Sequence, residues 1–344
     1  MKQGFEKPLV IAGSGRSGTT WVQDVIASAN GLKTIFEPLL PVLDDTAKKY
    51  ADRYLTAEVE APQLNAYMDR IFSGSLDNVW TNYRVRPDRL KPSLEQFKSC
   101  SKARAFYRRY KNLLNNYRIY NKGPNDGVSV KFIRANLMLE WLEANYDINV
   151  LFILRHPCAV IESKLRLDQV ARDAGLIEDM GDWDPYARLE RYFKDELFMQ
   201  DYITPYIGEL DVFDLSPAEA NTVIWCLENR PILTKGPGYG RSLACYETLV
   251  SSGSEEWERI ADELSINGLV DKSLLTKPSQ QASQDFHSAA SISSKLSRWQ
   301  DRFVESDKKR IDDVLTLFNI DVYSAFDPMP KNIFNLVKRA GNSH

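Results

Sequence analysis

Histidine and cysteine are scarce in this sequence of 344 residues. The three histidines, His156, His287 and His344, leave little material for histidine-based metal chemistry. The cysteines include no C-x-x-C pair and none is paired with a histidine, so the sequence indicates neither a zinc site nor a disulfide scaffold. The four cysteines are Cys100, Cys158, Cys226 and Cys245.

Long hydrophobic runs and a strong charge of one sign are also missing. The longest apolar run, at 150–154, is far shorter than the roughly 20 residues that a membrane-spanning helix needs. The first residues carry Lys2, Glu6 and Lys7, and Gly13 interrupts the apolar stretch that follows, which does not fit a signal peptide. The net charge of −3 argues against a nucleic-acid coat or a polybasic membrane surface. We therefore expect a cytoplasmic protein without a transmembrane segment and without a nucleic-acid partner.

Short apolar runs alternate with helical patterns along the chain. This alternation is typical of βαβ units around a parallel sheet. Strands are predicted at 8–12, 33–36, 128–133, 149–154 and 242–246, and helices over 22–29, 138–145, from 216 onward and over 311–318. The pattern predicts an α/β fold, a P-loop-like parallel β-sheet flanked by helices in a single domain over 1–344. Residues 40–125 interrupt the alternation and are interpreted as a helical insertion, and 277–297 as a loop.

A glycine-rich turn, Gly-Ser-Gly-Arg-Ser-Gly-Thr-Thr-Trp at 13–21, joins the first predicted strand to the first predicted helix. Such a turn brings backbone N–H groups and a helix N-terminus to one point, which is a cradle for phosphate. Three nucleotide sites are compatible with it. Gly13, Gly15 and Gly18 match G-x-G-x-x-G, with Glu37 where a ribose-binding acid would stand. A Walker loop would need lysine where Thr19 stands, which disfavours magnesium-dependent triphosphate chemistry. The third reading is a metal-free phosphate loop in which Arg16 supplies the cation.

A second motif follows the predicted strand at 149–154. Arg155-His156-Pro157 stands at the carboxyl end of this strand, where ligands bind in open α/β sheets. Ser163 lies about two turns into the helix that Pro157 begins. An arginine at the strand end and a hydroxyl eight residues later can bind one phosphate together. The two motifs together favour a ligand that carries phosphates.

These residues resemble the sulfotransferase superfamily that uses 3′-phosphoadenosine 5′-phosphosulfate (PAPS). The resemblance rests on the strand with G-S-G-R-S-G-T-T-W, then F-E-P at 36–38, then L-R-H-P-x-A-V-x-x-S at 154–163. It covers about 9–38 and 149–166 strongly, 245–249 and 295–299 weakly, and 40–125 not at all. Arg16 and the F-E-P segment look more like carbohydrate-type and bacterial members than like cytosolic ones, many of which carry lysine at that loop position.

The resemblance implies roles for individual residues. The loop would hold the 5′-phosphosulfate, Arg155 and Ser163 would bind the 3′-phosphate, and no metal would be required. The basic segment that completes the 3′-phosphate site in cytosolic members is missing, and Lys295 and Arg298 are candidates to replace it. The implied donor-binding residues are Gly15, Arg16, Ser17, Gly18, Thr19, Thr20, Trp21, Arg155, Ser163, Lys295 and Arg298.

Sulfuryl transfer needs a base for the acceptor hydroxyl and positive groups near the leaving phosphate. No histidine stands in a context that matches the base of the cytosolic enzymes, so Glu37 is the candidate base and Arg16 the candidate catalytic cation. A salt-bridging carboxylate is the alternative for Glu37. Lys131 either faces the sulfonate or the acceptor, or is a solvated lysine at a strand end. Trp21 either packs near the adenine or belongs to the core, and Trp299 is predicted to pack in the core rather than to contact the ligand.

The sequence thus predicts a sulfotransferase that acts on a hydroxyl-bearing acceptor, such as a glycan or a lipid-linked sugar. The 40–125 insertion would form the acceptor side, and its basic stretch at 98–122 is either a glycan-attracting surface or a solvated helix face. The alternatives are a Rossmann-type oxidoreductase that uses NAD(P) and a non-catalytic relative that binds nucleotides or glycans.

Overall fold

The computed structural model describes residues 6–76, 127–173, 184–207, 214–235, 241–252, 254–265, 270 and 296–331. Within these ranges, five strands form one sheet in the order β2-β3-β1-β4-β5, and every neighbouring pair is parallel. The strands are β1 (Leu9–Ala12), β2 (Lys33–Phe36), β3 (Val128–Phe132), β4 (Asn149–Leu154) and β5 (Arg241–Cys245). The predicted α/β class and parallel sheet are therefore confirmed.

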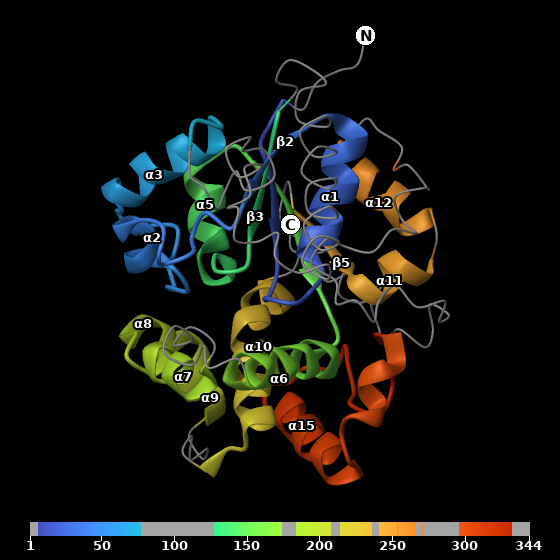
Figure 1. The fold of residues 1–344 in the computed structure, drawn as a ribbon. Coiled ribbons are helices and arrows are strands. Elements are labelled where there is room, and N and C mark those ends of the chain that lie inside the picture. Colours follow the sequence, from blue (N-terminus) through green and yellow to red (C-terminus); the bar gives the residue numbers. More distant parts are fainter. Residues whose placement is uncertain are drawn as a thin grey trace, which may run out of the picture.

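Helices cover both faces of this sheet (Figure 1). On one face lie α1 (Thr19–Asn30), α11 (Tyr246–Ser251) and α12 (Glu255–Glu263). The other face carries α2 (Asp45–Tyr50), α3 (Pro62–Phe72), η3 (Asn136–Met138) and α5 (Leu139–Asn145). Past the carboxyl ends of the strands, at the bottom of Figure 1, lie α6 (Pro157–Asp173), α7 (Pro185–Phe193), α8 (Glu196–Phe198), the π-helical η5 (Met199–Ile203), α9 (Thr204–Ile207), α10 (Pro217–Lys235), η8 (Arg298–Asp301) and α15 (Glu305–Leu317).

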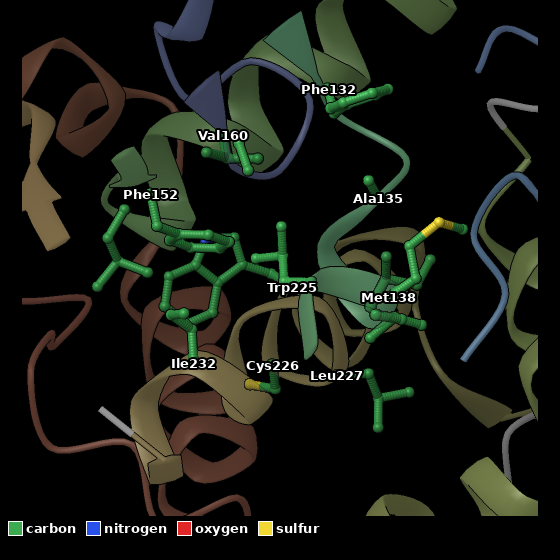
Figure 2. Packing of buried hydrophobic residues seen from close by; sticks show 14 of the residues in the cluster. Phe132, Ala135, Met138, Phe152, Val160, Trp225, Cys226, Leu227 and Ile232 are labelled. Atoms are coloured by element: carbon green, nitrogen blue, oxygen red, sulfur yellow. The ribbon is translucent and has the colours of Figure 1, made fainter. Parts of the chain in front are cut away.

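The side chains of β1, β4 and β5 alternate between two hydrophobic clusters, as the period of two in a β-strand requires. Leu9 and Ile11 of β1 point to the cluster under α1, α11 and α12, whereas Val10 and Ala12 point to the larger cluster on the opposite face. Figure 2 shows part of the larger cluster, in which Trp225 of α10 lies with Phe152 of β4. Because both faces are buried, all four residues of β1 are apolar.

The five predicted strands occur within one residue of their predicted ends, whereas α1 begins three residues before the helix predicted over 22–29 and α15 begins six residues before the one predicted over 311–318. The fifth strand is shifted by one residue, because it ends at Cys245 and Tyr246 already begins α11. The helix predicted from 216 onward is α10, and it begins with a capping box in which Ser216 N and Oγ donate to Glu219 and Glu219 N donates back to Ser216 Oγ. Of the predicted insertion, 40–76 contains α2 and α3, and the remainder lies outside the described residues, as do the basic stretch 98–122 and 277–295.

The strand order places two loops side by side at the carboxyl end of the sheet. β1 lies between β3 and β4, so the chain leaves β1 toward one edge of the sheet and reaches β4 on the other side. This is the topological switch point at which open α/β sheets bind ligands. The loop after β1 and the loop after β4 both begin there. No helix among the described residues is long and apolar enough to span a membrane.

Candidate functional site

The loop after β1 has a backbone that only a few residue types adopt. Gly13 has φ 150°, and a Cβ there would lie 2.4 Å from the carbonyl oxygen of Ile153 on β4. Gly18 has φ 87° and caps α1 without a side-chain hydrogen bond, so the first amides of the helix face the loop. Between them, Ser17 N donates to Ser14 O at 3.0 Å. The result is a tight turn that opens onto a helix N-terminus, which favours an anion.

The two motifs meet at Arg16. The Nη1 atom of Arg155 donates to the backbone carbonyl of Arg16 at 2.8 Å. The Nε atom of Arg16 donates to Ser163 Oγ at 2.9 Å. Residues that are 139 and 147 positions apart in the sequence therefore form one contact group at the ends of β1 and β4. The predicted donor-binding residues Arg16, Arg155 and Ser163 lie together.

This group carries more positive charge than its surroundings neutralise. Burial, together with the neighbouring cations Arg155 and Arg166, lowers the pKa of Arg16 to about 10, and Glu162 opposes that shift. Ser17 Oγ and Arg155 Nε are buried without a hydrogen-bond partner among the described residues. Buried polar atoms normally have partners, so these two fit a ligand that accepts hydrogen bonds. A phosphate oxygen is such an acceptor, and the cations favour its charge.

The ring of Tyr246 closes the loop from the other side. The guanidinium carbon of Arg155 lies 4.5 Å from the centre of that ring, and Trp21 meets it edge-on at 5.7 Å. A Cβ on Gly18 would come within 2.4 Å of the ring. Trp21 also packs edge-on against Trp257 and is 7% exposed, so it is part of the core, which is the alternative considered for it from the sequence.

Helix α10 braces both loops. Asn229 Nδ2 donates to Ser14 Oγ at 2.9 Å, and Trp225 Nε1 donates to the carbonyl of Arg155 at 3.1 Å. Sequence reasoning missed both residues, since an apolar helix that contains a tryptophan and an asparagine carries no signal for this contact. It also singled out Tyr246 only as part of a weakly matching segment.

His156 is a structural residue here. Its Nδ1 accepts from Cys158 N at 3.1 Å, its Nε2 lies 3.0 Å from the carbonyls of Ser324 and Asp327, and its ring stacks on Trp299 at 4.2 Å. Burial lowers the pKa of His156 to about 4. The imidazole is thus neutral and fully engaged, and Trp299 is a core residue, as predicted.

The backbone of His156 is also hydrogen-bonded to a buried acid. Glu247 accepts from His156 N at 3.0 Å and from Tyr323 Oη at 2.7 Å. Burial raises the pKa of Glu247. These contacts fix the residue that follows Arg155, so they hold the strand end on which the arginine stands.

Glu37 directly follows β2 and lies inside a cluster of cations. Its backbone is left-handed, with φ 45°, and its side chain is buried. Lys131 Nζ lies 2.9 Å from Oε1, Arg134 Nη1 lies 3.5 Å from Oε2, and Ile133 N donates to Oε2 at 3.3 Å. Lys131 is 3% exposed and also lies over the ring of Phe36, so the solvated lysine considered from the sequence is wrong. The salt-bridging alternative for Glu37 is present in the structure.

A cleft opens beside this cluster and beside the loop. Its volume is about 30 Å³, and it is open to solvent on one side. Gly15 brings the loop to its wall, Arg134 brings the cluster around Glu37, and α6, α7 and α10 supply the remaining sides. The lining residues are Gly15, Ile133, Arg134, Lys164, Pro185, Arg188, Asn221 and Ile224.

The remaining predicted residues are placed as follows. Thr19 and Thr20 are buried in the first turn of α1. Arg298 lies in η8, an element that packs against α6, whereas Lys295 and Gly236–Gly240 lie outside the described residues. Among the described residues, no group of three or more histidine, cysteine, aspartate or glutamate side chains could hold a metal ion.

Comparison with known proteins gives matches among solved structures only. No family model matches the sequence, and no curated protein matches it. Two sulfotransferase domains of known structure are similar to this chain. The sulfotransferase domain from the Synechococcus PCC 7002 olefin synthase has a TM-score of 0.46 and 17% identity, and covers 94% of this chain and 97% of its own. The sulfotransferase domain from the curacin biosynthetic pathway has a TM-score of 0.41 and 12% identity, with 90% and 97% covered.

Proposed function

We propose that this protein is a sulfotransferase that moves a sulfuryl group from PAPS to a hydroxyl of its acceptor. In this proposal the loop at 13–20 holds the 5′-phosphosulfate, and Arg155 and Ser163 hold the 3′-phosphate. The observation that carries it is the contact of Arg155 and Ser163 with Arg16, because it joins two phosphate-binding motifs at the switch point of the sheet. Ser17 Oγ and Arg155 Nε, which lack partners among the described residues, are suitable donors to the bound nucleotide.

The chemistry then depends on position and charge. An acceptor oxygen in the cleft attacks sulfur, the bond from sulfur to the bridging phosphate oxygen breaks, and the acceptor proton passes to a base. Arg16 and the amides at the start of α1 stabilise the charge that develops on the leaving phosphate. PAPS itself supplies the activated sulfuryl group. The protein contributes binding, alignment and a preorganised positive field.

Glu37 remains the proposed base. Its carboxylate lies at the end of β2, and Arg134, which contacts it, lines the cleft. Lys131 and Arg134 hold the carboxylate in place, so it does not need to be ordered when the acceptor binds. The alternative is that Glu37 only positions these two cations, and a variant at this position distinguishes the two roles.

The strand order disfavours the dinucleotide alternative. In the Rossmann order the strand that ends in the ribose-binding acid is next to β1. Here β3 lies between β1 and β2, and the Glu37 carboxylate is held by Lys131 and Arg134. The G-x-G-x-x-G match at 13–18 therefore lacks the acid that would accompany it in an NAD(P) site.

Ligand binding tests the proposal directly. We expect isothermal titration calorimetry to show that 3′-phosphoadenosine 5′-phosphate (PAP) binds and that NAD and NADP do not. Arg155→Ala removes the cation and should weaken PAP binding at least tenfold, since a charge-assisted hydrogen bond contributes roughly 1.5–3 kcal/mol. Transfer is then measured as a mass gain of one sulfate on an acceptor panel incubated with PAPS.

A matched control separates the site from general positive charge. Arg302→Ala removes an exposed arginine in the segment before α15 and should leave PAP affinity unchanged. Equal PAP affinity in the wild-type protein and in Arg155→Ala would contradict the assignment of the 3′-phosphate site. Binding of NAD but not of PAP would contradict the proposed function and support the oxidoreductase instead.

A further inference from the structure

Lys164 is a buried cation that lines the cleft and has no ion-pair partner among the described residues. It is 9% exposed, lines the cleft and makes no hydrogen bond or ion pair within 4 Å among the described residues. It follows Ser163 on α6, and consecutive helical positions point about 100° apart. Ser163 thus faces Arg16 of the nucleotide loop while Lys164 faces the adjoining cleft.

The other charged side chains around the cleft are in direct ion pairs. Glu37 is paired with Lys131 and Arg134. Arg188 of α7 joins Asp52 at 2.5 Å and Glu228 of α10 at 3.0 Å. The charges of Glu228 and Asp52 favour protonated Lys164 from a longer distance, and that of Arg188 opposes it. Arg188 contacts both of these carboxylates, so among the described residues Lys164 has no carboxylate within ion-pair distance.

A lysine in this position is costly without a ligand. Burial lowers the pKa of Lys164, as expected for an ammonium group that has lost water and gained no partner. Buried charges are ordinarily paired or hydrogen-bonded. An anion bound in the cleft would supply the missing partner and would also face Arg134.

We infer that the acceptor carries an anionic group, such as a carboxylate or a phosphate or sulfate ester, which Lys164 binds in the cleft beside Gly15. The inference rests on the proposed function, because it treats the cleft as the place where the acceptor lies. Gly15 joins the cleft to the loop that would hold the sulfuryl donor, so an acceptor anchored at Lys164 has its other end near that loop. The anion fixes the orientation of the acceptor, and a hydroxyl elsewhere on the same molecule is sulfated.

The experiment compares ligands that differ in one charge. The probes are 4-(hydroxymethyl)benzoate against 4-(hydroxymethyl)benzamide, and glucuronate against glucose. Each is titrated by NMR into the full-length protein saturated with PAP, and each is then offered with PAPS and assayed for mass gain. We expect the wild-type protein to bind the charged member of each pair about tenfold more tightly, the size of one charge-assisted hydrogen bond.

Three variants test whether Lys164 causes the preference for the charged probe. Lys164→Met should abolish the difference within each pair, whereas Lys164→Arg, which keeps the charge, should retain it. Lys309→Met removes an exposed lysine of α15 and should behave like the wild-type protein. PAP affinity, measured in all of them, should stay within twofold.

The outcomes are separable. If PAP does not bind the wild-type protein, the proposed function fails. If PAP binds and the wild-type protein does not prefer the charged probes, the inference alone is wrong, and this comparison does not require any variant to fold. A preference that survives in Lys164→Met also overturns it, because the anion then binds elsewhere.

Discussion

Gly18→Ala should destabilise the protein through the packing of one ring. Gly18 has φ 87°, a left-handed conformation that costs a residue with a Cβ about 1–2 kcal/mol. The added methyl group would lie 2.4 and 2.5 Å from two carbon atoms of the Tyr246 ring. That ring is 8% exposed and is held by Trp21 and Arg155, so it has little room to move. Overpacking of this kind costs about 1–3 kcal/mol.

The two costs give an expected loss of about 2–5 kcal/mol in the free energy of unfolding. With an unfolding entropy of roughly 2.1 cal/mol/K per residue over the whole chain, that loss corresponds to a decrease in Tm of about 3–7 °C. Urea unfolding and calorimetry measure both quantities. PAP affinity should also fall, because Gly18 caps the helix that closes the loop.

Gly15→Ala is the matched control within the same loop. Its Cβ would meet only Ile133 Cδ1, at an ordinary 3.5 Å, and its φ lies outside the left-handed region. Its effect on stability should therefore be within about 1 kcal/mol. In a Tyr246→Ala background the packing cost at Gly18 should vanish and only the backbone cost should remain. A loss in Gly18→Ala no larger than in Gly15→Ala, or unchanged in that background, would refute the reasoning.

Two further predictions concern single ionisable residues. Glu37→Gln keeps the shape but cannot accept the proton, so turnover with PAPS should fall about 10²–10⁴-fold while PAP affinity is kept. Full turnover in this variant would show that Glu37 only positions Lys131 and Arg134. The pKa of His156, about 4 in the fold against 6.5 in the unfolded chain, makes the unfolded state take up the proton first. Stability should therefore decrease by about 3 kcal/mol as the pH falls from 6.5 to 4, measured by urea unfolding. His156→Gln should lose less, and an equal loss would contradict this assignment.

The local parts of the fold were predictable because local residues determine them. A strand buried on both faces consists of consecutive apolar residues. A capping box such as Ser216–Glu219 is complete within four positions. The loop at 13–18 was equally readable, since glycines mark positions where a side chain would collide, as Gly13 shows against Ile153. Each of these signals lies within a short stretch of sequence.

The contacts that assemble the site were not predictable in the same way. Trp225 and Asn229 brace the two loops from a helix about 60 residues after β4, and nothing in their own neighbourhood indicates it. The pairing of Glu37 with Lys131 depends on β3 being next to β2, a property of strand order. The importance of Lys164 follows from Arg188 having taken both nearby carboxylates, which only the packing of α6, α7 and α10 reveals.

Backbone strain distinguishes the two strand ends of the site from the rest of the described chain. Five non-glycine residues of the described chain have positive φ. Three of them, Asp52, Ser265 and Asn319, come shortly after helices, and helices commonly end with a left-handed residue. Arg16 and Glu37 instead come after β1 and β2, where glycine would relieve about 1–2 kcal/mol at each position. The strain is held by contacts: Arg155 donates to the carbonyl of Arg16, and Glu37 N donates to Lys131 O at 3.1 Å. Stability alone would favour glycine at both positions. The proposed function instead explains the side chains, because Arg16 is its catalytic cation and Glu37 is its base.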